Sequence, residues 1–169
     1  MPDYIYPAPG VSGAQITVLL ENNADTTSDS LTLSGFQDVT INAANDTFTW
    51  EQLDSASKKQ IATTATNSVS MNLVVNQTKF FGADPDSTTT TDTMSNLGVF
   101  GASRLKSLVE FDIYLGDQDD GTAGLYVYGK GYVTGLAPTV SATEPVWVTP
   151  VTISVTGDYT VGASPTLTA

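Results

Sequence analysis

The stretch NSVSMNLVVN, residues 67–76, decides the fold of this 169-residue chain. Its apolar side chains recur at every second position from Val69 to Val75, and the positions between them are mostly small and polar. An alternation with a period of two is typical of a strand that buries one face and exposes the other. A second run of the same kind, VEFDIYL at residues 109–115, repeats the pattern with acidic residues on its polar side. The two runs predict a sheet with one apolar and one polar face.

Shorter apolar runs on both sides of these stretches predict further strands. They lie within residues 16–20, 31–50, 125–133 and 146–155. Asn45-Asp46 is typical of a hairpin turn, and Asp54 or Ser55 can cap a short helix at residues 54–65. About seven or eight short strands with one helix predict an all-β fold. We expect an antiparallel β-sandwich or partial barrel with one short flanking α-helix.

The chain is expected to have three parts. Residues 1–15, which are rich in proline, predict an extended N-terminal arm, and residues 161–169 a C-terminal tail. Between them, residues 16–160 predict a single β-sandwich domain. The threonine-rich residues 77–103 predict a long loop inside that domain, with one or two helical turns expected around Met94, Leu97, Val99 and Phe100. Loops of this length are usually functional or disordered.

The composition excludes several function classes. The chain has 18 acidic and 6 basic residues, which gives a net charge of -12, and it has no Cys and no His. Thiolate and imidazole metal sites, disulfides, Cys nucleophiles and Ser-His-Asp triads are therefore impossible. The negative charge repels nucleic-acid phosphates and anionic membranes. Asp outnumbers Glu and Lys is scarce, which also fits a high-salt host.

Individual motifs do not indicate catalysis or a cofactor. The acidic stretch from Asp117 to Gly121 resembles part of a calcium loop, but its Gly stands at the fifth position instead of the sixth. Ser103 and Lys106 match a short Ser-Lys nucleophile pattern without its companion motifs. We expect no catalytic residue, no metal and no cofactor, and hence a structural or binding protein.

The tyrosines give a clearer signal. Tyr126, Tyr128 and Tyr132 recur with a period of two on one predicted strand, so they share one of its faces. A row of tyrosines suits a subunit interface or a carbohydrate platform, and an ordinary exposed face with cross-strand aromatic pairs is the simpler alternative. We favour the interface over the sugar platform.

The order of elements resembles one family of proteins. The segment DTFTWEQL is followed by a short predicted helix, then by TNSVSMNLVV, a long loop, a second short helix and SLVEFDIYL. The C-terminal third contains GKGYVTGLA and then VTPVTISVTG. This order resembles the major tail tube protein of long-tailed, lambda-type (siphovirus-like) bacterial or archaeal viruses and the related tube protein of type VI secretion.

The resemblance implies a virion structural protein. Six subunits would form a ring, rings would stack into a hollow tube, and strands from all subunits would close one barrel around a channel. Viral DNA would pass through this channel during ejection without specific binding. The protein would lie in the virion tail, after assembly in the host cytoplasm, and would contact other tail proteins at the tube ends but no membrane.

The same resemblance assigns roles to particular residues. The polar strand faces would line the channel, and loop 77–103, the terminal arms and the tyrosine row would make contacts between subunits. The residues proposed to line the channel are Ser68, Ser70, Asn72, Glu110 and Asp112. Those proposed to lie between subunits are Phe80, Phe81, Tyr126, Tyr128 and Tyr132.

Two other readings remain open. A capsid decoration or head-tail connector protein would share the acidic, threonine-rich composition. A carbohydrate-binding or adhesin β-sandwich would use the tyrosines as its platform, although MPDYIYPAPG at residues 1–10 does not read as a secretion signal.

Overall fold

The computed structural model describes residues 17–25, 27, 29–33, 35–51, 57–115, 125–143, 146–164 and 166–167. The predicted N-terminal arm and the acidic stretch at residues 117–121 lie outside these residues. The elements are β1 (Thr17–Asn22), β2 (Leu31–Leu33), β3 (Phe36–Trp50), β4 (Lys59–Val74), α1 (Gln77–Phe81), α2 (Met94–Leu105), β5 (Leu108–Leu115), β6 (Leu125–Leu136), β7 (Val148–Val155) and β8 (Thr160–Gly162).

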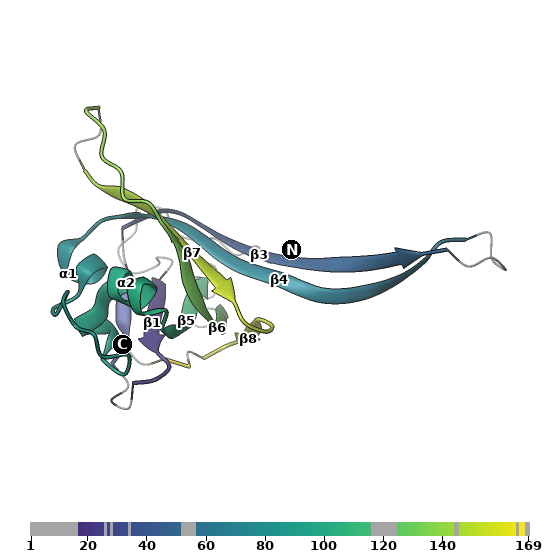
Figure 1. Ribbon diagram of the computed structural model, residues 1–169, viewed down its shortest axis with the longest axis horizontal. Coiled ribbons are helices and arrows are strands. Elements are labelled where there is room, and N and C mark those ends of the chain that lie inside the picture. Colours follow the sequence, from purple (N-terminus) through teal and green to yellow (C-terminus); the bar gives the residue numbers. More distant parts are fainter. Residues whose placement is uncertain are drawn as a thin grey trace, which may run out of the picture.

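All eight strands belong to one antiparallel sheet, in the order β2-β1-β5-β6-β7-β4-β3, with β8 paired to β6. Leu33 from one end of this order and Val39 and Ile41 from the other end join the same core. A flat sheet could not bring its two ends together, so the sheet curls into a partial barrel. The predicted all-β class is confirmed. Both helices lie at one end of this body (Figure 1).

The alternation in the deciding stretches is confirmed. Val69, Met71 and Leu73 of β4 are buried, as are Val109 and Ile113 of β5. The helices complete this core from outside the sheet. They contribute Phe80 from α1 and Met94, Val99 and Ala102 from α2.

Two predictions between residues 45 and 65 are wrong. The dipeptide Asn45-Asp46 does not end a strand, because β3 continues to Trp50 and absorbs the irregularity as a register shift between Asn45 and Thr47. The expected helix at 54–65 is also wrong, because β4 already begins at Lys59. The threonines of this segment favour an extended chain, and pairing with β3 decides the outcome.

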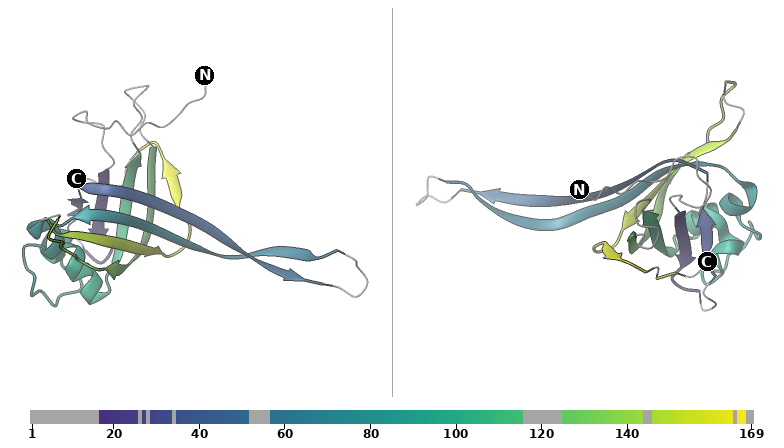
Figure 2. Two further views of the ribbon diagram at one scale, coloured as in Figure 1. Left: turned by 90° about the horizontal axis from the view of Figure 1, so that it is seen from above. Right: turned by 180° about the vertical axis from the view of Figure 1, so that it is seen from behind.

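The correction creates the most prominent feature of the molecule. The outer parts of β3 and β4, residues 43–50 and 59–67, pair with each other only, since β7 reaches β4 no further than Ser68. We call this two-stranded segment the β-arm. Figures 1 and 2 show it projecting far from the body, in the direction opposite to the helices.

The turn before β8 holds the base of the β-arm. The hydroxyl of Tyr159 lies 2.9 Å from the carbonyl oxygen of Asn42 and 2.7 Å from that of Ser68, which are partners across β3 and β4. The amide of Asn67 donates to the carbonyl oxygen of Gly157. Burial raises the pKa of the Tyr159 phenol further above its ordinary value, which already keeps the group protonated and able to donate at neutral pH. The angle at which the β-arm leaves the body is thereby fixed.

Within the expected loop at residues 77–103 the structure has two helices joined by a shorter segment, and the helical turns expected between Met94 and Phe100 belong to α2. Asn76 caps α1, its side chain accepting from the backbone N–H of Thr78 and Lys79, and Thr93 caps α2 by accepting from the N–H of Asn96. Capping residues begin both helices despite the threonine-rich composition.

The segment between the helices is held against the body. The side chain of Asn22, which is fully buried, donates to the carbonyl oxygens of Thr90 and Asp92. Asp92 in turn accepts from the side chains of Asn96 and Ser87, and these hydrogen bonds lower its pKa. This threonine-rich segment is therefore an ordered part of the fold.

Candidate assembly surfaces

The face of the sheet that points away from the core forms a continuous polar surface over β3, β4 and β7. Ser70 lies between Thr40 of β3 and Thr152 of β7, and Ser68 lies between Asn42 and Ser154. One row further along, Asn72 donates to the Asp38 carboxylate at 2.7 Å. The side chains of this surface are short, polar and largely uncharged.

The same face continues across β6 and β5, so the residues expected to line a channel and the tyrosine row share one face of the sheet. Tyr132 lies opposite Ser154 on one side and Leu108 on the other. Tyr126 packs against Tyr114 with 5.0 Å between ring centroids. We call this entire side of the sheet the polar face. Tyr132 is exposed, whereas Tyr126 and Tyr128 are half-buried.

Asp112 departs from its expected role. Its side chain is only 1% exposed, because Thr166 and Leu167 lie over it. One carboxylate oxygen accepts from the N–H of Thr166 at 2.6 Å, from its hydroxyl at 3.0 Å and from the N–H of Leu167 at 2.8 Å. In the folded chain Asp112 therefore anchors the C-terminal residues and does not face an open surface, and we omit it from the set proposed below.

Among the described residues of the body strands, Lys130 is the only cation, and it is neutralised. It forms an ion pair with Glu110 and donates to the side-chain oxygen of Asn23 at 2.7 Å. Nearby, burial and the negative charges of Glu110, Asp25 and Asp29 raise the pKa of Glu21. The charge presented by this face is therefore neutral to negative.

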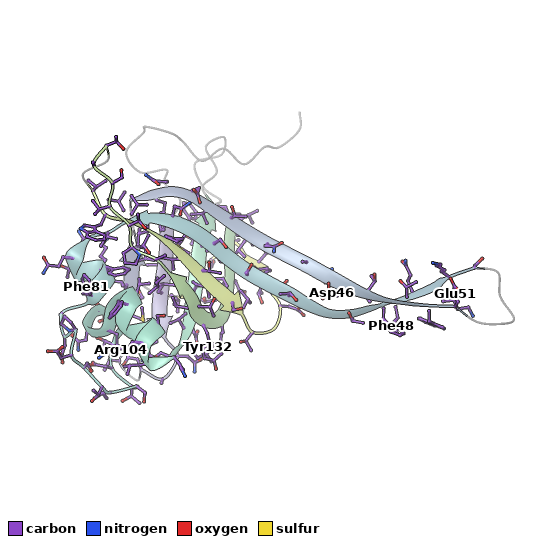
Figure 3. The ribbon with its side chains drawn as sticks, turned by 45° about the horizontal axis from the view of Figure 1, so that its top comes forward. Asp46, Phe48, Glu51, Phe81, Arg104 and Tyr132 are labelled. Carbon is purple, nitrogen blue, oxygen red and sulfur yellow. The ribbon has the colours of Figure 1, made fainter. Side chains whose placement is uncertain are left out.

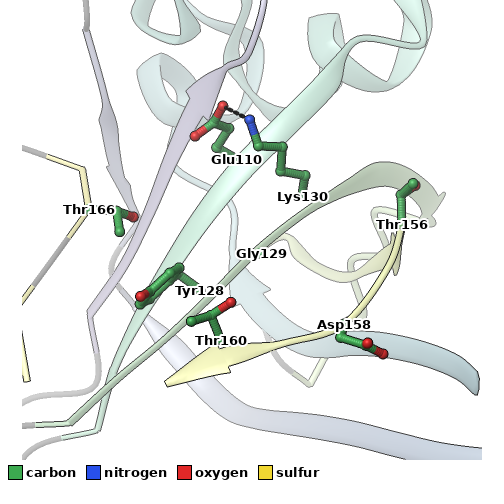
Figure 4. A pocket seen from close by; sticks show the side chains of 8 residues that line it. All are labelled: Glu110, Tyr128, Gly129, Lys130, Thr156, Asp158, Thr160 and Thr166. Atoms are coloured by element: carbon green, nitrogen blue, oxygen red, sulfur yellow. Dashed lines mark hydrogen bonds and ion pairs between the residues drawn. The ribbon is translucent and has the colours of Figure 1, made fainter. Parts of the chain in front are cut away.

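A shallow cavity of about 410 Å³ opens around this ion pair (Figure 4). It is lined by Glu110, Tyr128, Gly129, Lys130, Thr156, Asp158, Thr160 and Thr166. The two charged groups point toward each other, and the remaining groups are hydroxyls and one separate carboxylate. Such a set offers neither an activated nucleophile nor a group of metal ligands. No group of metal-ligating residues occurs elsewhere in the described ranges either.

The helical end of the body exposes two aromatic rings. Phe81 and Phe100 are 38% and 40% exposed, and their ring centroids lie 5.6 Å apart. Phe80 was expected at a subunit interface, but it is 1% exposed and belongs to the core, because α1 turns it inward beneath the two exposed rings. Sequence reasoning missed Phe100, since nothing distinguishes it from the buried apolar residues of α2.

The far end of the β-arm exposes a second aromatic group. Phe48 is 59% exposed and stacks on Trp50 at 6.1 Å, and Ile61, opposite Phe48, is 57% exposed. At the same end, the Nζ atom of Lys58 lies 3.3 Å from the Oε1 atom of Glu51. Figure 3 shows Phe48 and Glu51 far from Phe81 and Arg104, with the body between them. The alternation of Phe48 and Trp50 was visible in the sequence, but the wrongly predicted turn and helix concealed its partner Ile61.

Known proteins resemble this chain in structure but not in sequence. No family model and no curated protein matches the sequence. The tail of an empty gene transfer agent particle, refined with helical C6 symmetry, contains a chain that is 15% identical, with a TM-score of 0.58. The match covers 90% of this chain and 99% of that one. This chain has the tail tube fold.

Two further structures extend the tail tube fold to other assemblies. The SPP1 tail tube gives a TM-score of 0.64 at 8% identity, covering 91% of this chain and 80% of that one. A chain of the anti-feeding prophage baseplate gives 0.53 at 10% identity, covering 94% and 98%. Neither helix that the structure describes is both long and apolar enough to cross a membrane.

Proposed function

We propose that this protein is the tail tube subunit of a virus-like particle and acts as a structural protein of the virion tail. The observation that carries the proposal is the tail tube fold. The structural match to the gene transfer agent chain covers 90% of this chain and 99% of that one. The exposed apolar β-arm supports it, because a two-stranded ribbon with large apolar side chains in water is marginal without a partner. Self-assembly would provide that partner.

In the proposed assembly six copies form a ring and rings stack into a tube. The gene transfer agent tail has C6 symmetry, which supports the number six. Within the part of the chain that the structure describes, the outermost strands of the sheet, β2 and β3, leave unpaired edges. Pairing between neighbours would close the sheets into one barrel and remove edges that otherwise invite uncontrolled association. Other tail proteins would contact the two ends of this tube.

The polar face would line the channel through which DNA passes during ejection. Ser68, Ser70, Asn72 and Glu110 lie on it, and its only body-strand cation in the described residues is paired. Phosphates would find no free cation there, so DNA would slide without being held. The tyrosines at the β6 side of this face, together with Phe81, would contact neighbouring subunits.

Electron microscopy of the purified protein, in low salt and in multi-molar salt, tests the assembly. We expect rings or hollow tubes with six-fold end views. Assembly only in high salt would add a halophilic origin. A monodisperse monomer or trimer in both buffers would contradict the proposal and favour a decoration protein or an adhesin.

The channel assignment has its own test. Ser70→Lys combined with Asn72→Lys should leave tubes intact but slow DNA ejection several-fold, because two new cations per subunit would bind phosphates. Ser70→Gln with Asn72→Gln is the matched neutral control and should eject at the normal rate. Equal ejection rates for the two variants would show that this face does not meet DNA.

A further inference from the structure

We propose that Lys130 and Asn23 join through an isopeptide bond between their side chains, with Glu110 carrying the proton for the reaction. The bond is a covalent modification that the chain makes on itself, from its own residues and with no cofactor. It goes beyond the proposed function, because it forms within one folded chain and does not depend on assembly.

The three side chains meet beside the polar face, although they come from distant parts of the chain. The Nζ atom of Lys130 lies 2.7 Å from the Oδ1 atom of Asn23 and 2.5 Å from the Oε1 atom of Glu110. The carbonyl carbon Cγ of Asn23 is about 1.2 Å from Oδ1, so Nζ lies within about 3.9 Å of the carbon that it would attack. Reacting atoms in productive complexes lie about 3–3.5 Å apart. A small rotation of the Asn23 amide is therefore sufficient to bring the two atoms into reach.

The backbone holds Lys130 and Glu110 opposite each other. The two residues are partners across β5 and β6. Gly131, next to Lys130, is packed so closely that a Cβ there would lie 2.4 Å from the carbonyl oxygen of Ser154. The N–H of Thr156 donates to the carbonyl oxygen of Lys130 at 2.8 Å. The amine is therefore carried by a segment of strand that cannot shift away from the carboxylate.

The turn after β1 holds Asn23 against the start of β5. The N–H of Asn23 donates to the carbonyl oxygen of Leu108 at 3.0 Å. The preceding residue, Asn22, is fully buried, and its side chain donates to two carbonyl oxygens of the segment between the helices. Well-oriented reactions within one molecule reach effective molarities of about 10⁵–10⁸ M. Because the fold holds both reactants in place, the amine meets the amide at a concentration of this kind.

Two neighbouring carboxylates can hold the proton that the amine must lose. In the ion pair Lys130 is an ammonium, and only the neutral amine is a nucleophile. Glu21 lies opposite Glu110 across β1 and β5. Burial, and then the charge of Glu110, raise the pKa of Glu21, so two negative charges oppose each other at this place. A proton is therefore less costly on this carboxylate pair than on an isolated carboxylate.

The reaction balances without any further reactant. The Lys130 ammonium passes one proton to the Glu110 carboxylate, and the neutral Nζ attacks the Cγ atom of Asn23. The bond between Nζ and Cγ forms, and the bond between Cγ and Nδ2 breaks. The departing nitrogen takes back the proton from Glu110 and a second one from Nζ, and it leaves as ammonium. Proton transfer by a positioned carboxyl group accelerates such a step by about 10²–10⁴-fold.

The bond would tie three strands of the body together. Asn23 follows β1 and Lys130 lies in β6, with β5 between them. The two residues are 107 positions apart, and a cross-link that closes a long loop restricts the unfolded chain most. The chain has no Cys and hence no disulfide that could do the same. The reaction also converts a cation of the polar face into a neutral amide.

Mass spectrometry of the purified full-length chain tests the inference. After several days at physiological temperature, the chain should be lighter than its sequence mass by one molecule of ammonia. Trypsin should then fail to cleave after Lys130, and it should release residues 1–58 joined to residues 107–169. A cyclic imide at an asparagine also loses ammonia, but it leaves these peptides separate. That result, or an unchanged mass, would overturn the inference.

Three variants and one control separate the roles of the residues. Lys130→Arg keeps the positive charge without a nucleophilic amine, and Asn23→Ala removes the amide, so both should keep their full mass. Glu110→Gln has the same size but takes up no proton, and it should slow the linkage about 100-fold or more. Lys59→Arg, on the β-arm, should link at the normal rate. Linkage at the normal rate in Glu110→Gln would overturn the role of Glu110. None of these results requires tubes, so the inference and the proposed function are tested separately.

Discussion

The two halves of β4 make a natural comparison. Residues 68–74 lie between β3 and β7 and turn Val69, Met71 and Leu73 into the core, whereas residues 59–67 pair with β3 alone and leave Ile61 in water. The chain and the strand geometry are the same in both halves. The difference is the number of neighbours, so hydrophobic side chains in the inner half stabilise the monomer, and those in the outer half can act only when another molecule covers them.

The largest expected effect is a contrast between two substitutions in this one strand. Met71→Ala should lower the free energy of unfolding by about 3 kcal/mol, because it removes a buried side chain and leaves a cavity. Ile61→Ala should change it by less than about 0.5 kcal/mol in dilute protein, but should weaken assembly. Urea unfolding below the assembly concentration measures both values, and equal losses would show that the β-arm is buried in the monomer.

A smaller effect is expected at Asp112 on the polar face, which the C-terminal residues of the same chain cover. Asp112→Ala should cost about 2 kcal/mol of unfolding free energy, because three donors from Thr166 and Leu167 lose their charged acceptor. The C-terminal residues should also become accessible to carboxypeptidase. Asp112→Asn keeps one acceptor oxygen and is the conservative control. If Asp112→Ala left digestion unchanged, the C-terminal contact would not depend on this carboxylate.

The smallest effect concerns Glu21 and should be confined to the body. Burial and nearby carboxylates raise its pKa in the folded chain above the unfolded value, so its ionised form opposes folding and stability rises as the pH falls through the folded pKa. Glu21→Gln should therefore stabilise the protein near pH 7 by no more than about 0.5 kcal/mol, because solvent screens the charges around this partly exposed group, and by nothing at a pH below the unfolded pKa.

Hydrogen exchange locates this effect. The amides of β1 and β5 should gain protection in Glu21→Gln at neutral pH, whereas those of the β-arm should not. A stabilisation that is equal at both pH values would mean that the charge of Glu21 is not its cause.

The sequence predicted the inner half of β4 well and the outer half badly, for a physical reason. A period of two is enforced where one face is buried, so the run from Val69 to Leu73 was unambiguous. In the outer half no core enforces a pattern, and local signals such as Asn45-Asp46 outweighed the weak alternation of Phe48 and Trp50. The outer half of β4 is a strand because it pairs with β3, from Trp50 and Lys59 to Ala43 and Asn67. Composition does not reveal this register.

The candidate site residues divide in the same way. Ser68, Ser70 and Asn72 could be placed on one face because strand geometry alone decides it. Phe80 and Phe81 are adjacent, and only the direction of α1 determines which of them is buried. The burial of Asp112 could not be predicted, because Thr166 and Leu167, which cover it, lie 54 and 55 positions further along the chain. No local sequence pattern indicates a contact of that range.

The hydroxyl of Tyr159 contacts a backbone carbonyl oxygen of each strand where the β-arm leaves the body. The β-arm is therefore a lever with a defined pivot. From Ala43 to Trp50 the lever is about 23 Å long at the usual strand rise, so a tilt of about 5° at its base displaces the tip by about 2 Å. In an assembly joined through the β-arm, that displacement would accumulate from one copy to the next. The pitch and bore of the assembly would then depend on the orientation of a single phenol ring as much as on the surfaces that touch.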